Sequence, residues 1–130
     1  MGQQQLLLII LGVIIVGIAI AVGLSLFAAN SVQANKDAIV NDINNLAANA
    51  YQYYIRPLSM GGGAGDYTKY TVPFKMSSND NATYVASAGS TTSLTFTGTS
   101  HTNSGTVVGT VDNLGKVTFD PSTGFTGDFK

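Results

Sequence analysis

Residues 6–29 read LLLIILGVIIVGIAIAVGLSLFAA, and no charged side chain interrupts them. The run is about 24 residues long, whereas a helix needs roughly 20 apolar residues to cross a bilayer. The first charged side chain of the whole sequence is Lys36. The run therefore predicts an N-terminal helix that requires apolar surroundings, either lipid or other helices.

Two ordinary interpretations of such a run are a signal peptide and a plain membrane anchor. A signal peptide has a basic start and an apolar core of about 7–15 residues, but here the basic start is missing and the run is too long. A plain anchor is usually flanked by a cluster of Lys or Arg, and no such cluster flanks either end of the run. Small residues four apart, such as Gly17 and Ala21 or Ala19 and Gly23, let helices approach closely. This spacing favours a helix that packs against copies of itself, with the plain anchor as the alternative.

Beyond residue 29 the pattern becomes amphipathic, with apolar residues every three or four positions. The apolar stripe consists of Val32, Ile39, Ile43, Leu46, Ala47, Ala50, Tyr51 and Tyr54. Pro57 disfavours helical backbone at Arg56, and the glycine run at 61–65 follows. We expect one helix from about residue 3 to residue 55, about 80 Å long at 1.5 Å per residue. Gly12, Gly17 and Gly23 are the predicted weak points of this helix.

The rest of the chain is predicted to form a small β-rich head. Alternation of apolar and polar residues places Leu94 and Phe96 on one face of a strand, and residues 112–115 form a hairpin turn. The expected strands are 67–74, interrupted by Pro73, and 83–87, 93–97, 105–111 and 116–119. We therefore predict the α+β class, a long N-terminal α-helix packed on a small antiparallel sheet of three or four strands.

The apolar face of this sheet needs a partner, and the helical stripe that ends in Tyr51, Tyr54 and Ile55 is the only one the sequence offers. The predicted helix–sheet core consists of Ile43, Leu46, Ala50, Tyr51, Tyr54, Leu94, Phe96, Val117 and Phe119. The predicted organisation is an apolar half-helix (1–29), an amphipathic half-helix (30–56), a Gly-rich connector (57–66) and the head (67–130).

The composition argues against several kinds of chemistry. Charged residues make up 10% of the chain, cysteine is absent, and no basic patch could hold a nucleic acid by charge. The single histidine, His101, lies in a Ser/Thr/Asn-rich loop, and Asp112, Asp120 and Asp128 fit turns better than a calcium site. We expect no catalytic, cofactor-binding or metal-binding residues, no cofactor and no small-molecule substrate. The chain is not expected to be an enzyme.

Three further motifs have modest interpretations. The glycine run at 61–65 lacks the Lys-Ser/Thr ending of a phosphate loop and follows a helix instead of a strand. Tyr51, Tyr53 and Tyr54 are assigned to packing, because helical spacing places two of them on the core face. The tripeptide Asn81-Ala82-Thr83 matches the N-glycosylation pattern, which makes Asn81 the candidate modification site.

The start of the chain, MGQQQLLLIILGVIIVGIAI, followed by the amphipathic stripe and a C-terminal sheet, resembles the type IV pilin family and its pseudopilin relatives. In that register Met1 is the first residue after removal of a leader, and Gln5 stands where most members carry Glu. A second register has residues 1–2 as a very short leader cut before Gln3. The resemblance covers roughly the first 55 residues, since heads vary widely in this family.

The chain also departs from the family pattern. Because Gln5 is neutral, it cannot pair by charge with the N-terminal amine of a neighbour, and Gln3, Gln4 and Gln5 are expected to form hydrogen bonds in the fibre core instead. The helix-breaking proline of the low twenties is missing, with Gly23 as its expected substitute. The head lacks the disulfide loop that is common in bacterial members.

The resemblance implies a structural subunit of an extracellular helical filament, a homopolymer of many identical copies. The precursor would wait in the cytoplasmic membrane and meet a prepilin peptidase and the pilus assembly machinery, and its new N-terminus would be methylated. Adhesion and motility are roles that the family implies. The residues assigned to helix packing in the filament core are Met1, Gln5, Leu6, Leu7, Ile10, Gly12, Ile14, Gly17, Ala21 and Gly23. The alternative is a monomeric, single-pass membrane-anchored binding module or adhesin.

Overall fold

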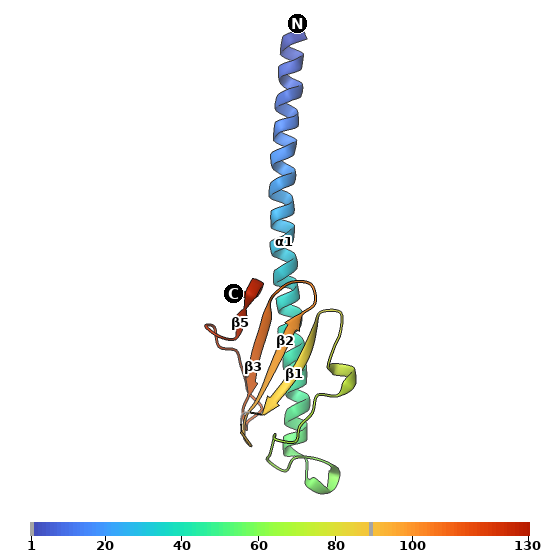
Figure 1. The fold of residues 1–130 in the computed structure, drawn as a ribbon, viewed down its shortest axis with the longest axis vertical. Coiled ribbons are helices and arrows are strands. Elements are labelled where there is room, and N and C mark those ends of the chain that lie inside the picture. Colours follow the sequence, from blue (N-terminus) through green and yellow to red (C-terminus); the bar gives the residue numbers. More distant parts are fainter. Residues whose placement is uncertain (1, 89) are drawn as a thin grey trace. The chain divides into compact units, whose positions relative to one another are not determined.

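The structure is a computed structural model that describes residues 2–88 and 90–130. Its elements are the helix α1 (Gly2–Ile55), the strands β1 (Ala82–Ala88), β2 (Leu94–Ser100), β3 (Thr106–Val111), β4 (Val117–Thr118) and β5 (Phe125–Thr126), and short 3-10 helices at Leu58–Met60, Phe74–Met76 and Gly127–Phe129 (Figure 1). This arrangement confirms the predicted α+β class. The chain forms two compact units, Met1–Val32 and Gln33–Lys130, so the head includes the second half of α1.

The helix α1 ends at Ile55, immediately before Arg56 and Pro57, as the sequence predicted. The glycine run then folds back over the end of the helix. The Gly63 amide donates to the Tyr53 carbonyl at 2.8 Å and the Gly65 amide donates to the Tyr54 carbonyl at 2.7 Å. Gly65 has a φ of +87°, a backbone conformation that L side chains rarely adopt. The run is therefore a cap that satisfies carbonyls which every helix leaves open at its C-terminus.

The sheet is antiparallel, with β1, β2, β3 and β4 in that order and β5 also paired with β3. The short strands β4 and β5 share one side of β3, where Thr110 lies opposite Thr118 and Thr106 lies opposite Thr126. Between them, the Val108 amide donates to the Gly124 carbonyl at 2.7 Å. This side of β3 is thus covered along its length, and the sheet includes a short strand, β5, that was not among the expected strands.

The strand predicted over 67–74 is wrong, because this part of the chain folds into turns. The Tyr70 amide donates to the Tyr67 carbonyl at 3.0 Å, which closes a turn instead of a ladder. Pro73, which has no amide hydrogen to give to a ladder, precedes the 3-10 helix Phe74–Met76.

The outer edge of β1 is only partly paired. The Tyr84 amide donates to the Ser77 carbonyl at 2.8 Å, and the Asn79 amide donates to the Ala82 carbonyl at 3.0 Å. Residues 77–79 therefore cover the first half of this edge, whereas the described structure holds no further chain segment against the strand beyond Tyr84.

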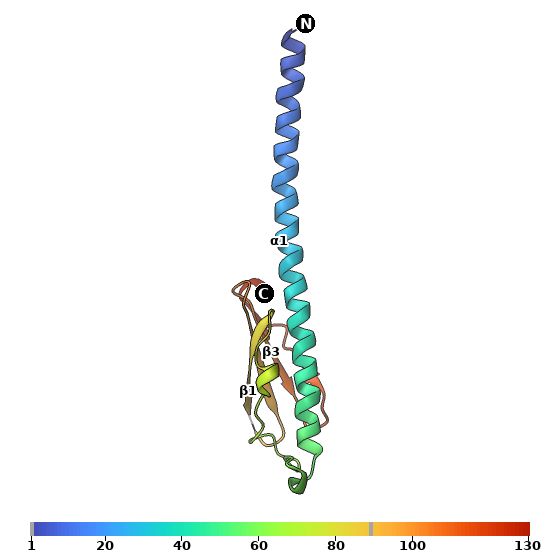
Figure 2. The ribbon, with the colours of Figure 1, turned by 90° about the vertical axis from the view of Figure 1, so that its right-hand side faces the viewer.

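One face of the sheet packs on the part of α1 that belongs to the head (Figure 2). Along β2 the residues alternate as predicted, with Leu94 and Phe96 buried and Thr95 and Thr97 partly exposed on the opposite face. The helix approaches the sheet closely at Gly98, where an added Cβ would stand 2.7 Å from Ile39 Cγ2. Glycine is required here because the strand has no room for a side chain under the helix.

Most of the residues assigned to the helix–sheet core do lie between the two elements. Ile43, Leu46, Ala50, Leu94 and Phe96 are buried, and Tyr51, Tyr54, Val117 and Phe119 are partly buried. The expectation that Ile55 joins this core is wrong, because its side chain is 59% exposed. The core also contains buried residues that were not predicted to belong to it, namely Tyr67, Tyr70, Tyr84, Val107, Val111 and Phe129.

Candidate functional site

The first half of α1 presents the largest apolar surface of the chain. Every large apolar side chain from Leu6 to Phe27 is between 52% and 73% exposed. A soluble helix usually buries an apolar stripe and exposes a polar one, whereas a helix that is apolar all round belongs in a core or in lipid. This segment therefore needs a partner on every side, and we treat it as the candidate assembly surface.

Length and composition allow this segment to cross a membrane, since α1 contains a window long and apolar enough to do so. The polar side chains at its start are the amides of Gln3, Gln4 and Gln5, and no charged side chain precedes Lys36. An uncharged segment can exchange lipid for protein without removing an ionised side chain from water or placing one in hydrocarbon. The chemistry of the segment thus suits both environments.

The structure places the residues assigned to filament packing together on this segment. Gln5, Leu6, Leu7, Ile10, Gly12, Ile14, Gly17, Ala21 and Gly23 are all exposed residues of α1, whereas Met1 lies outside the described residues. At Gly12, Gly17 and Gly23 no heavy atom beyond the helix's own backbone comes within 4 Å of an added Cβ. These glycines therefore leave open notches in the surface, into which the side chains of another helix can fit.

The head is held to α1 by a polar cluster that the sequence analysis did not find. Ser100 Oγ donates to Asn35 Oδ1 at 2.6 Å, and Asn103 Nδ2 donates to the same oxygen at 3.2 Å. Asn35 Nδ2 in turn donates to the Asn81 carbonyl at 3.3 Å. One asparagine of the helix therefore contacts two segments of the head, the end of β2 with its connection to β3 and the residue before β1.

Two further contacts join α1 to the head near this cluster. The Lys36 ammonium lies 4.2 Å from the centre of the Phe125 ring, a cation–π contact. The Tyr84 hydroxyl donates to Asp42 Oδ2. Burial, followed by this bond to Asp42, raises the pKa of Tyr84 well above its usual value. Two of the three charged residues of α1, Lys36 and Asp42, thus contact the sheet.

A cluster of tyrosines surrounds the C-terminal end of α1. Tyr54 stacks on Tyr67 with ring centres 4.4 Å apart, and Tyr53 meets Tyr70 edge-on at 5.5 Å. The Tyr70 hydroxyl donates to Asn49 Oδ1 at 2.8 Å. Burial raises the pKa of Tyr70 and of Tyr67 to about 12, so both hydroxyls keep their protons at neutral pH.

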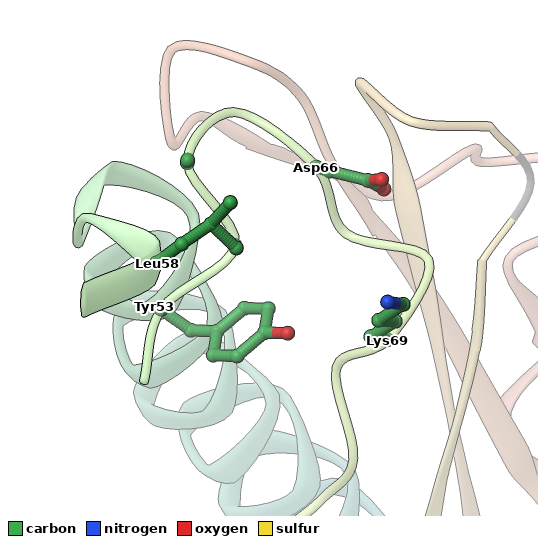
Figure 3. Close-up of a pocket in the computed structure, with 7 residues that line it drawn as sticks. Tyr53, Leu58, Asp66 and Lys69 are labelled. Atoms are coloured by element: carbon green, nitrogen blue, oxygen red, sulfur yellow. The ribbon is translucent and has the colours of Figure 1, made fainter. Parts of the chain in front are cut away.

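Two hollows lie beside Tyr53. The first, of about 310 Å³, is bounded by Leu58, Asp66 and Lys69 (Figure 3). The second, of about 270 Å³, shares Tyr53 and Lys69 and is also lined by Asn49, Gln52 and Arg56. Polar and charged groups from three segments of the chain meet there, a grouping that sequence spacing does not reveal.

The remaining candidates have simpler roles. His101 Nε2 lies 3.1 Å from Thr83 Oγ1 and 3.4 Å from Ser78 Oγ, on the exposed surface. The backbone amide of Asn81 donates to Asn79 Oδ1 at 2.9 Å, which places the start of the glycosylation motif in a tight turn before β1. Hydrogen bonds from Ser122 lower the pKa of Asp120 to about 2, as expected for a turn residue. Across residues 2–88 and 90–130, no three His, Cys, Asp or Glu side chains are grouped as a metal site.

Comparison with protein-family models, with curated proteins and with solved structures finds no match to this chain. The candidate functions therefore rest on the residues and their arrangement.

Proposed function

We propose that this chain is the repeating subunit of an extracellular helical filament of the type IV pilin kind, held together by the apolar first half of α1. The observation that supports this proposal most strongly is the exposure of every large apolar side chain from Leu6 to Phe27. At roughly 25 cal/mol per Å² of apolar surface removed from water, such a segment gains far more by association than by hydration.

The head fits this role, because α1 is also its main packing partner. Buried side chains such as Ile39 and Ile43 belong to the same helix as the exposed apolar segment. A copy that is fixed in a filament through its apolar segment would therefore carry its head with it. Contacts between different surfaces of identical copies generate an open helical polymer when the rotation between neighbouring copies does not close into a ring.

Disulfide cross-linking within assembled material tests this proposal directly. The chain contains no cysteine, so single variants such as Ile14→Cys and Gly17→Cys report only on contacts between copies. We expect oxidation to give dimers from these variants in surface material sheared from cells, together with fibres in electron micrographs. A Cys placed at the exposed position Asn44 is the matched control and should cross-link less.

A single-pass anchor is the second candidate, favoured by the finding that the same segment can cross a membrane. An anchored monomer would stay in the membrane fraction, would give no fibres on shearing, and would give no cross-linked dimers from Ile14→Cys. That combination of results would overturn the filament proposal and support a membrane-anchored binding module.

A further inference from the structure

We propose that the 270 Å³ hollow beside Tyr53 binds an acidic sugar, a ring that carries a carboxylate and hydroxyl groups. Two of the six cationic side chains of the chain, Arg56 and Lys69, line this hollow, and none of the seven aspartates does. The net charge of the whole chain is −1. Attraction for an anion at this place is therefore a local property of the hollow and not of the protein as a whole.

Arg56 is not needed to complete the end of the helix. The amides of Gly63 and Gly65 already donate hydrogen bonds to the carbonyls of Tyr53 and Tyr54, and the Ala64 amide donates to the Arg56 carbonyl at 3.0 Å. A cation near a helix C-terminus commonly compensates carbonyls that lack partners. Because backbone amides fill that role here, the guanidinium is available to a ligand, and its planar fork suits a carboxylate.

The Tyr53 ring is fixed in place before any ligand arrives. Tyr70 supports it edge-on at 5.5 Å, and an added Cβ at Gly63 would stand 2.8 Å from Tyr53 Cε1. Glycine at position 63 thus makes the room that this ring occupies. A ring held in this way offers a flat apolar surface to the C–H face of a sugar without losing much conformational freedom on binding.

Asn49 is oriented by the same group of residues. Its Oδ1 accepts a hydrogen bond from the Tyr70 hydroxyl at 2.8 Å, which leaves its Nδ2 group as a donor for a ligand. The pKa of about 12 keeps Tyr70 protonated, so this orientation persists through the physiological range. With Gln52 beside it, the hollow offers neutral donors and acceptors for hydroxyls next to its two cations.

The size of the hollow favours one small ring over a polymer backbone. Sites for drug-sized ligands occupy about 300–1,000 Å³, so about 270 Å³ suits a single sugar unit. A nucleic acid would require a row of cations along its phosphates, whereas the residues that line this hollow include two, Arg56 and Lys69. Asp66 and Lys69 both line the neighbouring 310 Å³ hollow (Figure 3). The negative charge of Asp66 is therefore expected to limit the affinity for an acidic sugar.

Titration of the full-length protein in detergent with a galacturonic acid trisaccharide tests the proposal, with a neutral galactose trisaccharide as the comparison ligand. We expect Arg56→Gln and Lys69→Gln each to weaken binding of the acidic trisaccharide about tenfold. Lys116→Gln removes the same charge from the turn between β3 and β4 and should leave binding unchanged. Asp66→Asn should strengthen binding, because it removes the one carboxylate beside Lys69.

Several results would overturn the assignment. If the neutral trisaccharide bound as tightly as the acidic one, the two cations would have no role in binding. If Lys116→Gln weakened binding as much as Arg56→Gln, the attraction would come from the charge of the whole protein and not from this hollow. A single-stranded oligonucleotide that binds through Arg56 and Lys69, while the trisaccharide does not, would assign the hollow to nucleic acid. Electron microscopy of the same variants keeps this question separate from filament formation, because the apolar segment is unchanged in each of them.

Discussion

The Cγ2 methyl group of Ile39 in α1 lies directly over the backbone of Gly98 in β2, where an added Cβ would stand 2.7 Å away. Ile39 is fully buried, so at this point the helix meets the main chain of the sheet, whereas Leu94 and Phe96 of the same strand contribute buried side chains to the core. The same arrangement recurs at Gly109, whose added Cβ would stand 3.0 Å from Ile43 Cγ2. These two glycines set how closely the helix and the sheet can approach.

Replacing Gly98 by alanine should destabilise the head by about 1–3 kcal/mol, because overpacking forces neighbouring groups out of position. Urea unfolding of the full-length protein in detergent, followed by near-ultraviolet circular dichroism, measures the change. Thr99→Ala is the matched control on an exposed neighbour. The double variant with Ile39→Ala should lose less stability than the two single variants together, and strict additivity would mean that the two residues do not meet.

Replacing Asn35 by alanine should cost about 1–3 kcal/mol, because Ser100 and Asn103 lose their shared acceptor in a partly buried place. Protease sensitivity of the loop 101–105, together with the urea midpoint, checks this expectation. Gln33→Ala, which removes only an exposed hydrogen bond to Asp37, should change neither measurement. An Asn35→Ala protein as stable as the wild type would show that the cluster does not hold the head to the helix.

A lysine at position 14 should prevent assembly and weaken membrane insertion, since a charge at the centre of a bilayer helix costs about 2.5–3.5 kcal/mol on insertion scales. Counting fibres in sheared surface material and the share of protein in the membrane fraction tests the effect. The exposed residue Asn44 lies on the head-bearing part of α1, so Asn44→Lys is the control and should allow fibres. Normal fibres from Ile14→Lys would exclude the apolar segment as the assembly surface.

The head should lose stability as the pH rises from about 10 to about 12. The pKa values of Tyr67 and Tyr70 are raised to about 12 in the folded chain, whereas an unfolded tyrosine titrates near 10. The contribution of each is complete below pH 10 and declines as the pH passes through the folded pKa, because the unfolded chain releases its protons first.

The double variant Tyr67→Phe/Tyr70→Phe separates this effect from general alkaline unfolding. It should be less stable at pH 8, because it loses the hydrogen bonds to Asp112 and Asn49. Its stability should nevertheless fall less steeply between pH 10 and pH 12 than that of the wild type. Urea midpoints at four pH values give both slopes, and parallel slopes would contradict the assignment.

The fold was predictable from the sequence where a regular spacing of apolar residues continues over many positions and ends at a proline or a glycine run. The helix ends at Ile55 because Pro57 follows, and β2 alternates as Leu94 and Phe96 require. The short strand β5 could not be predicted, because two residues beside Gly124 contain no period. The segment 67–74 has the composition of a strand. Its tyrosines instead pack against tyrosines at the end of α1, and its backbone forms turns.

The apolar first half of α1 is predictable from the sequence because its apolar character depends on composition alone. The Asn35 cluster and the Tyr53 hollow are not, because they join residues that lie far apart in the chain. Asn35 meets Ser100 across 65 positions, and the partners of an asparagine cannot be known before the loops are placed. A glycine run directly after a helix is typical of a C-terminal cap, so the capping role of residues 61–65 could have been predicted from the sequence.

The short edges of the sheet affect what happens when many heads are crowded together. Beyond Tyr84, β1 offers only its last few residues for pairing with a foreign strand, and on the other side β4 and β5 are two residues long. Long open edges invite sheets to fuse into ribbons. In a filament of the proposed kind, such short edges would limit pairing between the sheets of neighbouring heads.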